Sequence, residues 1–343
     1  MLIHYRWVLA LCSMLAWPLV AVGQQLAPIA PRVVVAHQPN SIDSLQTTQQ
    51  VEQWIRRTIR KNYFYPAFEV DTLLINYGAV CQQVCAGLPV RPYVKVDMDG
   101  NGYTDLLVYR RRHFGRGRSE SELYLIKCYG PRSFVVEYVQ GRGSGYCQAA
   151  AVVQLEGRPA LIYQHDVTPV GADGFAEQML PQTDTLVHRF GDLVEYNRQP
   201  EAAPFQRLEA RFGYDCCARF AITLFADRKV LYEETGQFFD YQILRRPPPE
   251  IFTSTLDSAA FEQIASLFQY IKPSGLAPDY AVNWTDAGTA WLSVAMQDGR
   301  ALTIKDYGEQ GTWGLSRLYA LLAGLRTQQH WQSITRPYNV PAR

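Results

Sequence analysis

Side chains that carry oxygen recur at alternate positions in one short stretch, residues 97–105. Counted from its first residue, they stand at positions 1, 3, 5 and 9, and a glycine at position 6 permits a sharp turn. Calcium takes about six to eight oxygen ligands in flexible geometry, whereas magnesium requires a stricter octahedron. The stretch therefore predicts a Ca²⁺ site. Its expected ligands are Asp97, Asp99, Asn101, the main-chain carbonyl of Tyr103, and Asp105.

The surrounding sequence excludes an EF-hand, because Val108 occupies position 12, where an EF-hand needs a bidentate Glu. The run D-x-D-x-N-G-x-x-D, followed at once by a strand, resembles the calcium loops of FG-GAP repeats in integrin-type propellers and, more loosely, those of dockerins. It occurs once, so a propeller is not supported. The alternative is a metal-free hairpin turn, which Asp, Asn and Gly also favour. With three carboxylates we expect an affinity on the order of 0.1–1 mM, which suits an extracellular module.

The N-terminus has the shape of a signal peptide, with a short basic lead up to Arg6 and an apolar run from Trp7 to Val22. The run is too short for a comfortable membrane span, and small residues precede Gln24, where we expect cleavage. We therefore expect export to the periplasm or the extracellular space, with no membrane span in the mature protein.

Charge and composition limit the possible partners. The chain has 33 Lys and Arg residues against 32 Asp and Glu residues, and the expected signal peptide holds one Arg, so the mature protein would have no formal net charge. Nucleic acid is therefore not an expected partner. With 48% hydrophobic residues the chain can bury a large core, and at this length we expect two.

The cysteines indicate disulfides. There are seven, of which the expected signal peptide holds one, and an even number in an oxidising compartment favours disulfides over catalytic thiols or zinc. We expect at least two. The candidate pairs are Cys81–Cys85, which one helical turn brings to about 6 Å between Cα atoms, and Cys128–Cys147.

A basic cluster could bind an anionic polysaccharide or a lipid head group. It consists of Arg110–Arg112 with Arg116 and Arg118, between two expected strands. Glu120 and Glu122 follow directly and can balance it, and charged hairpin tips commonly protect strand edges. We therefore favour a solvated hairpin loop.

No convincing catalytic set is present. Ser144, His165 and Asp166 are the nearest approach to a hydrolase triad, but the serine is not in a G-x-S-x-G turn and nothing orients the pair. The adjacent Cys216 and Cys217 could form a strained vicinal disulfide with redox behaviour. Pairing with other cysteines, or one of the two staying buried and free, is commoner.

The N-terminal half predicts one helix followed by strands. Apolar residues at helical spacing predict a helix from Ser41 to about Lys61, capped by Ser41 or Ser44, and a second short helical piece holding Cys81 and Cys85. Beyond the calcium-type loop, β-rich runs separated by turn residues predict an antiparallel meander. The runs are Asp105–Tyr109, Glu122–Tyr129, Ser133–Gln140, Ala149–Glu156, Pro159–His165, Thr183–Phe190 and Leu193–Asn197.

The C-terminal part predicts a hairpin, then helices around further strands. The hairpin joins residues 221–225 to residues 230–232. Asp257 or Ser258 can cap a helix with one apolar side. A last helix carries Leu315, Leu318, Leu322 and Leu325 at helical spacing.

This part resembles a known family. Cys217–Leu224 and Asp227–Tyr232 are similar to the C-P-x-Y-s-l-t-i…D-G-x-v-x-Y opening of domain-of-unknown-function family 6438, found in exported bacterial proteins. The helix at Phe261–Ile271 and the step Trp284–Asp286 follow the same order, so the resemblance spans about Phe205 to Gln332. Ala218, Phe220 and Arg228 depart from the family pattern. Since the family has no established activity, the resemblance implies no functional residues.

Together these features predict an α+β protein: an N-terminal helix plus an antiparallel β meander, then a smaller α+β domain with a hairpin and two helices. We expect an exported, non-enzymatic binding or structural module braced by calcium, with an unknown envelope or extracellular ligand. The alternative is an envelope hydrolase with its site between the domains. The expected segments are a signal peptide (1–23), an extended linker (24–40), a domain with the calcium-type loop (41–200), the unknown-function domain (201–335) and a tail (336–343).

Overall fold

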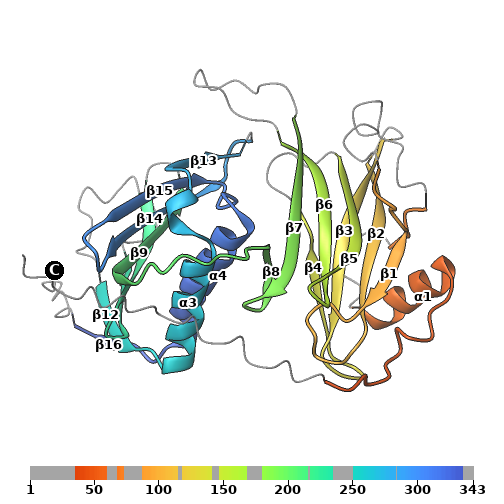
Figure 1. Ribbon diagram of the computed structural model, residues 1–343, viewed down its shortest axis with the longest axis horizontal. Coiled ribbons are helices and arrows are strands. Elements are labelled where there is room, and N and C mark those ends of the chain that lie inside the picture. Colours follow the sequence, from red (N-terminus) through yellow and green to blue (C-terminus); the bar gives the residue numbers. More distant parts are fainter. Residues whose placement is uncertain are drawn as a thin grey trace, which may run out of the picture. The chain divides into compact units, whose positions relative to one another are not determined.

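The computed structural model describes residues 35–59, 68–72, 87–114, 118–140, 147–167, 180–214, 217–234, 250–282 and 284–334. Contacts group the chain into the units Met1–Val35 and Ala36–Arg343, and the fold described is that of the second. It has helices and strands, with strands predominating (Figure 1), so the α+β class is confirmed. The expected signal peptide and the expected disulfide partners Cys81 and Cys85 lie outside the described residues. Among the described residues, no helix is both long and apolar enough to cross a membrane.

The first helix, α1 (Thr48–Thr58), begins later than the sequence predicts. Thr47 caps it in a capping box: its side chain accepts a hydrogen bond from the Gln50 N–H, and the Gln50 side chain accepts one from the Thr47 N–H. The expected start at Ser41 is wrong, because the Asn40 side chain accepts a hydrogen bond from the Ile42 N–H and holds that segment in a turn.

Two antiparallel four-stranded sheets follow, each with its strands in chain order. The first consists of β1 (Tyr93–Val96), β2 (Asp105–Phe114), β3 (Arg118–Cys128) and β4 (Phe134–Tyr138). The second consists of β5 (Gln148–Leu155), β6 (Arg158–Val167), β7 (Leu180–Arg189) and β8 (Asp192–Glu195). Each strand run predicted between Asp105 and Asn197 overlaps one of β2–β8. The expected single meander is therefore two sheets.

Side chains that alternate between the two faces of β2 and β3 explain how α1 and the two sheets form three layers. Leu106 and Val108 of β2 pack in one cluster with Val51 and Ile55 of α1. The intervening Leu107 belongs to another cluster, with buried residues of β5–β8. Successive side chains of a strand point to opposite faces, so the first sheet contacts α1 on one face and the second sheet on the other.

The C-terminal part is built on one eight-stranded sheet. Its strand order is β13-β15-β14-β9-β10-β11-β12-β16, and only β13 and β15 are paired in parallel. The strands are β9 (Phe205–Tyr214), β10 (Cys217–Phe225), β11 (Lys229–Glu234), β12 (Glu250–Thr255), β13 (Asp279–Ala281), β14 (Gly288–Met296), β15 (Ala301–Tyr307) and β16 (Gln332–Ser333). The predicted hairpin is β10–β11. It is part of an eight-stranded sheet, which is larger than the small domain with one hairpin that the sequence predicts.

Two helices supply the rest of this core: α3 (Ser258–Tyr270) and α4 (Trp313–Gln328), with a short 3-10 turn, η1 (Pro273–Gly275), after α3. Asp257 caps α3 by accepting a hydrogen bond from the Ala260 N–H, as predicted. The predicted apolar side of the last helix is confirmed, because its four leucines lie buried in one cluster with strand residues.

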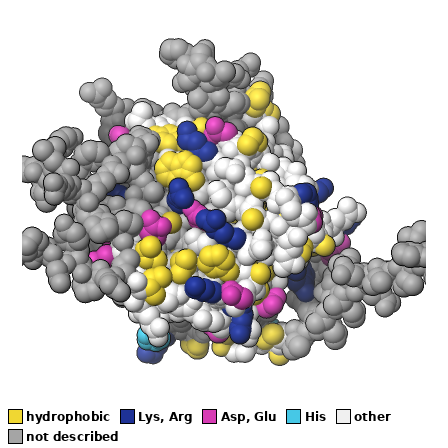
Figure 2. All heavy atoms as spheres, turned by 90° about the vertical axis from the view of Figure 1, so that its left-hand side faces the viewer, with side chains coloured by type: hydrophobic (Ala, Val, Ile, Leu, Met, Phe, Trp, Pro, Cys, Tyr) yellow, Lys and Arg dark blue, Asp and Glu magenta, His cyan; other side chains and the backbone are white. Residues whose placement is uncertain are grey.

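The predicted break near residue 200 coincides with a change of sheet, since the eight-stranded sheet begins at Phe205. Contacts nevertheless group residues on both sides in one unit, and Val194 of β8 belongs to the cluster of α3 and α4. The division into two domains stays a prediction. On the face drawn in Figure 2, Lys and Arg side chains lie among Asp and Glu side chains.

Candidate metal site

The calcium-type loop connects β1 to β2. The two strands pair antiparallel, with Val96 opposite Asp105, so the loop starts and ends side by side. Gly100 and Gly102 have φ angles of +74° and +91°. Only glycine adopts such values at little cost, which explains why the loop needs glycine at these two positions.

The Asp97 carboxylate organises the turn. It accepts hydrogen bonds from the backbone N–H groups of Gly100 (2.8 Å), Asn101 (3.1 Å) and Gly102 (3.0 Å). An Asp that bonds backbone groups shortly after itself is a frequent turn device. Plain Asp turns make the same bonds, so these contacts alone do not distinguish a cation site from a metal-free turn.

The loop brings the three predicted acidic ligands together. One carboxylate oxygen from each of Asp97, Asp99 and Asp105 lies within 4.8 Å of the others. Carboxylate oxygens are the ligands that Ca²⁺ and Mg²⁺ prefer. The residue types and their separation therefore fit a hard cation.

Asp105 is the most constrained of the three, with a fully buried side chain. It accepts hydrogen bonds from the Met98 N–H (2.9 Å) and the Cys128 N–H (2.8 Å), which tie the loop to the end of β3. Burial, and to a lesser extent the charges of Asp99 and Asp97, raise the pKa of Asp105 to about 7. Burial also raises the pKa of Asp99. A cation beside these groups would lower both values.

Asn101 does not direct its oxygen at the acidic cluster. Its Nδ2 donates to Asp99 Oδ2 (3.1 Å) and to the Cys128 carbonyl (2.8 Å), while its Oδ1 accepts from the Tyr103 N–H (2.8 Å). To serve as the expected ligand, the amide would have to turn. Tyr103 forms an isolated β-bridge with Gln38. This bridge holds the backbone of Tyr103, whose carbonyl is an expected ligand, in place.

The end of the expected linker packs on this loop. The Gln38 N–H donates to the Gly102 carbonyl (2.8 Å), and Asn40 Nδ2 donates to the Thr104 carbonyl (2.8 Å). Asp43 accepts a hydrogen bond of 2.6 Å from the Thr104 hydroxyl. Gln38 and Asn40, at the end of the expected linker, therefore belong to the packed structure around the loop, and the linker itself stays a prediction. Nothing in the local sequence signalled these contacts.

Lys127 is a buried cation near the cluster that sequence reasoning missed. It is 2% exposed, forms an ion pair with Glu137, and partly offsets the raised pKa of Asp99. Its Nζ also lies 3.3 Å from His188 Nε2, on β7 of the second sheet. A lysine within the apolar end of β3 was the available signal, since lysines are rarely buried without a partner.

The basic cluster is neutralised where the structure describes it. Arg110 and Arg112 pair with Glu122 at 2.9 Å each, and Arg111 pairs with Asp71 at 2.7 Å and with Glu69 at 3.2 Å. Arg116, and the side chain of Arg118, lie outside the described residues. The described arginines therefore act in intramolecular ion pairs. The pair of Arg110 and Glu122 is buried, so at this position the expectation of a solvated loop is wrong.

Of the residues considered as a hydrolase triad, His165 and Asp166 contact different partners. Ser144 lies outside the described residues. His165 is fully buried and its Nε2 contacts Asp184 Oδ2 at 3.0 Å, while the carboxylate of Asp166 accepts a hydrogen bond from the Cys147 N–H. Trp313 Nε1 donates to the same Asp184 oxygen. This arrangement is a buried structural network.

The expected Cys128–Cys147 disulfide is wrong. Cys128 is a buried free thiol whose Sγ donates to the Gly130 carbonyl at 3.1 Å. Cys147 is disulfide-bonded, so its partner is another cysteine. The expected pair Cys81–Cys85, Cys216, and the side chain of Cys217 lie outside the described residues.

Comparison with known proteins identifies part of the chain. Residues 207–326 match the family model described as Domain of unknown function (DUF6438). This confirms the family resemblance of the C-terminal part, and the match does not include the calcium-type loop. No curated protein matches the chain.

Proposed function

We propose that this protein is an exported, non-enzymatic binding or envelope-associated module in which Ca²⁺ braces the hairpin of β1 and β2. The observation that carries the proposal is the convergence of Asp97, Asp99 and Asp105, with ligand oxygens within 4.8 Å of one another. The buried Asp105 supports it, because an ionised carboxylate beside two others is unfavourable until a cation compensates the charge.

The bound ion would link three segments of the chain. The loop joins β1 to β2, Asp105 accepts a hydrogen bond from the Cys128 N–H at the end of β3, and the Gly102 carbonyl accepts one from Gln38. Neutralising the carboxylates would stabilise all three segments together. The role of the ion in this proposal is structural, and the ligand of the module is a separate question.

Calcium should raise the melting temperature of the purified protein after chelation. The stabilisation follows RT ln(1 + [Ca]/Kd), which is roughly 2.7 kcal/mol at about 100 times Kd. Asp99→Asn tests the site most cleanly, because Asp99 accepts fewer backbone hydrogen bonds in the turn than Asp97 does. We expect this variant to fold without calcium and to lose the calcium-dependent gain.

Asp298→Asn is the matched control, since Asp298 lies in an exposed turn of the C-terminal part. It should keep the full calcium response. If millimolar calcium shifts no transition of the unmodified protein and calorimetry detects no binding, the stretch is only a hairpin turn. Export is tested separately by intact-mass measurement of the mature protein, which we expect to begin at Gln24.

A further inference from the structure

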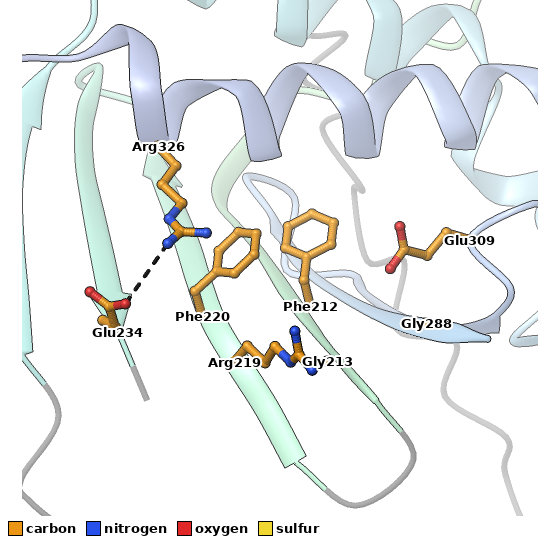
Figure 3. Close-up of a pocket in the computed structure, with 8 residues that line it drawn as sticks. All are labelled: Phe212, Gly213, Arg219, Phe220, Glu234, Gly288, Glu309 and Arg326. Atoms are coloured by element: carbon orange, nitrogen blue, oxygen red, sulfur yellow. Dashed lines mark ion pairs between the residues drawn. The ribbon is translucent and has the colours of Figure 1, made fainter. Parts of the chain in front are cut away.

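A pocket opens at one end of the eight-stranded sheet, beside α4, with a volume of about 210 Å³. Strands β9, β10, β11 and β14, the turn after β15, and α4 all contribute to its lining (Figure 3). The lining residues are Phe212, Gly213, Arg219, Phe220, Glu234, Gly288, Glu309 and Arg326. None of them belongs to the calcium-type loop.

One side of the pocket is aromatic. The rings of Phe212 and Phe220 stack with centroids 4.8 Å apart. The Arg326 guanidinium lies 5.3 Å from the centroid of the Phe220 ring and pairs with Glu234 at 3.8 Å, the contact dashed in Figure 3. The charge of Arg326 is therefore already compensated, and this side offers an apolar wall.

Glu309 stands on the opposite side of Phe212 from Arg326, and its carboxylate extends toward the pocket (Figure 3). Its φ angle of +57° is unusual for a residue other than glycine, and the Ser316 hydroxyl donates a hydrogen bond of 2.8 Å to its backbone carbonyl. Gly288 leaves room for the carboxylate, because a Cβ there would lie 2.7 Å from Glu309 Oε1. The backbone thus holds this side chain in place.

The Glu309 carboxylate is half-buried and, among the described residues, has neither a hydrogen-bond donor nor a cation as its partner. Burial, followed by the charge of Asp306, raises the pKa of Glu309. Asp306 is buried near Glu309, and the two carboxylates together make this side of the pocket negative.

We propose that this pocket binds a small organic cation, with its ammonium group against Glu309 and an apolar or aromatic group against Phe212 and Phe220. An ammonium would supply the charge partner and the hydrogen-bond donors that Glu309 lacks. An anion would be repelled by Glu309 and Asp306. The two arginines of the lining do not offset this repulsion, because Arg326 is paired with Glu234 and the exposed Arg219 has an interaction of its own. This proposal goes beyond the calcium site and does not depend on it.

Phenethylamine and 2-phenylethanol are a suitable pair of probes, since both carry a phenyl ring on two carbons and only the amine is charged. Titration of the full chain, followed by NMR or calorimetry, should show saturable and stronger binding of the amine. Glu309→Gln should weaken amine binding about tenfold or more, because it removes one charge-assisted hydrogen bond. The same substitution should leave the binding of the alcohol unchanged.

Glu234→Gln is the matched control, because Glu234 lines the same pocket but is already paired with Arg326. It should reduce amine binding much less than Glu309→Gln does. Asp99→Asn should leave amine binding unchanged, which separates this pocket from the calcium site. Unchanged melting temperatures would show that the variants are folded. Absence of saturable amine binding, or equal binding of amine and alcohol to the unmodified protein, would overturn the proposal.

Discussion

The carboxylate of Glu195 accepts a hydrogen bond of 2.6 Å from the backbone N–H of Trp313, and its other oxygen accepts one of 2.8 Å from Gly314. Glu195 ends β8 in the second sheet, whereas Trp313 begins α4 on the eight-stranded sheet. The first N–H groups of a helix have no partner within the helix, and this end carries a partial positive charge. A side chain from one part of the protein therefore caps a helix of the other part.

Removing this cap should destabilise the protein. Glu195→Ala leaves the partly buried N–H groups of Trp313 and Gly314 without this acceptor, and we expect a loss of about 2–3 kcal/mol in the free energy of unfolding. Glu195→Gln keeps one acceptor oxygen and should lose less. Urea denaturation measures both values. Glu262→Ala, an exposed position in α3, should change stability by no more than about 0.5 kcal/mol. Equal stability of Glu195→Ala and the unmodified protein would contradict this role.

The pH dependence of stability should contain a contribution from His188. Burial, with the charges of Lys127 and Arg317, lowers the pKa of His188 from 6.5 to about 4. Because the folded pKa lies below the unfolded value, the folded state binds fewer protons between these two values. The stability contribution is present above about pH 6.5 and is lost as pH falls toward about 4, by at most about 3 kcal/mol.

Comparison with His188→Gln isolates this contribution, because the other titrating groups stay the same. Glutamine can still accept the hydrogen bond that neutral His188 accepts from Lys127 Nζ. Denaturation at pH 7 and pH 4.5 should show a smaller loss of stability in the variant. Identical losses in both proteins would mean that His188 is not held neutral.

The sequence could predict what depends on neighbouring residues. The helical spacing of the leucines predicts α4, and the backbone freedom of glycine predicts the turn at Gly100 and Gly102. Strand β9 was missed although its signal was readable, since Leu208, Ala210 and Phe212 alternate with polar residues and are buried. Pro200 and Pro204 lie just before this strand, at the predicted boundary between the two domains, and prolines favour loops over strands.

Features that depend on distant segments could not be predicted from local patterns. Lys127 lies 61 residues from His188, and Asp43 lies 61 residues from Thr104. No period or motif connects residues so far apart. The Cys128–Cys147 pairing failed for the same reason, because a choice among several cysteines requires the positions of the strands that carry them.

Cys128 should behave as a protected free thiol. It is fully buried, and burial raises the pKa of its thiol, so the reactive thiolate is scarce in the folded state. Iodoacetamide should label Cys128 only after unfolding, without any reductant. Peptide mapping of the labelled protein under non-reducing conditions measures this. Finding the Cys128 peptide linked to another cysteine would contradict the structure.

Calcium affinity should depend on pH through Asp105. Its pKa of about 7 lies above the ordinary 3.8, so without metal the group favours the folded state below about pH 4, and this contribution is lost as pH rises through about 7. A cation binds the ionised form and must displace the proton. From pH 7.5 to pH 5.5, competition by one proton at this pKa should weaken calcium binding about 25-fold.

Calorimetric titration with CaCl2 at the two pH values measures this ratio. In thermal melts, the calcium-dependent gain in stability should grow as the pH rises from 5.5 to 7.5. Asp298→Asn, far from the loop in sequence, should give the same ratio as the unmodified protein. An affinity that is equal at both pH values would mean that no buried carboxylate loses a proton when the ion binds. Asp105 would then be a structural acceptor for the Met98 and Cys128 N–H groups, and Asp97 and Asp99 would hold any ion without it.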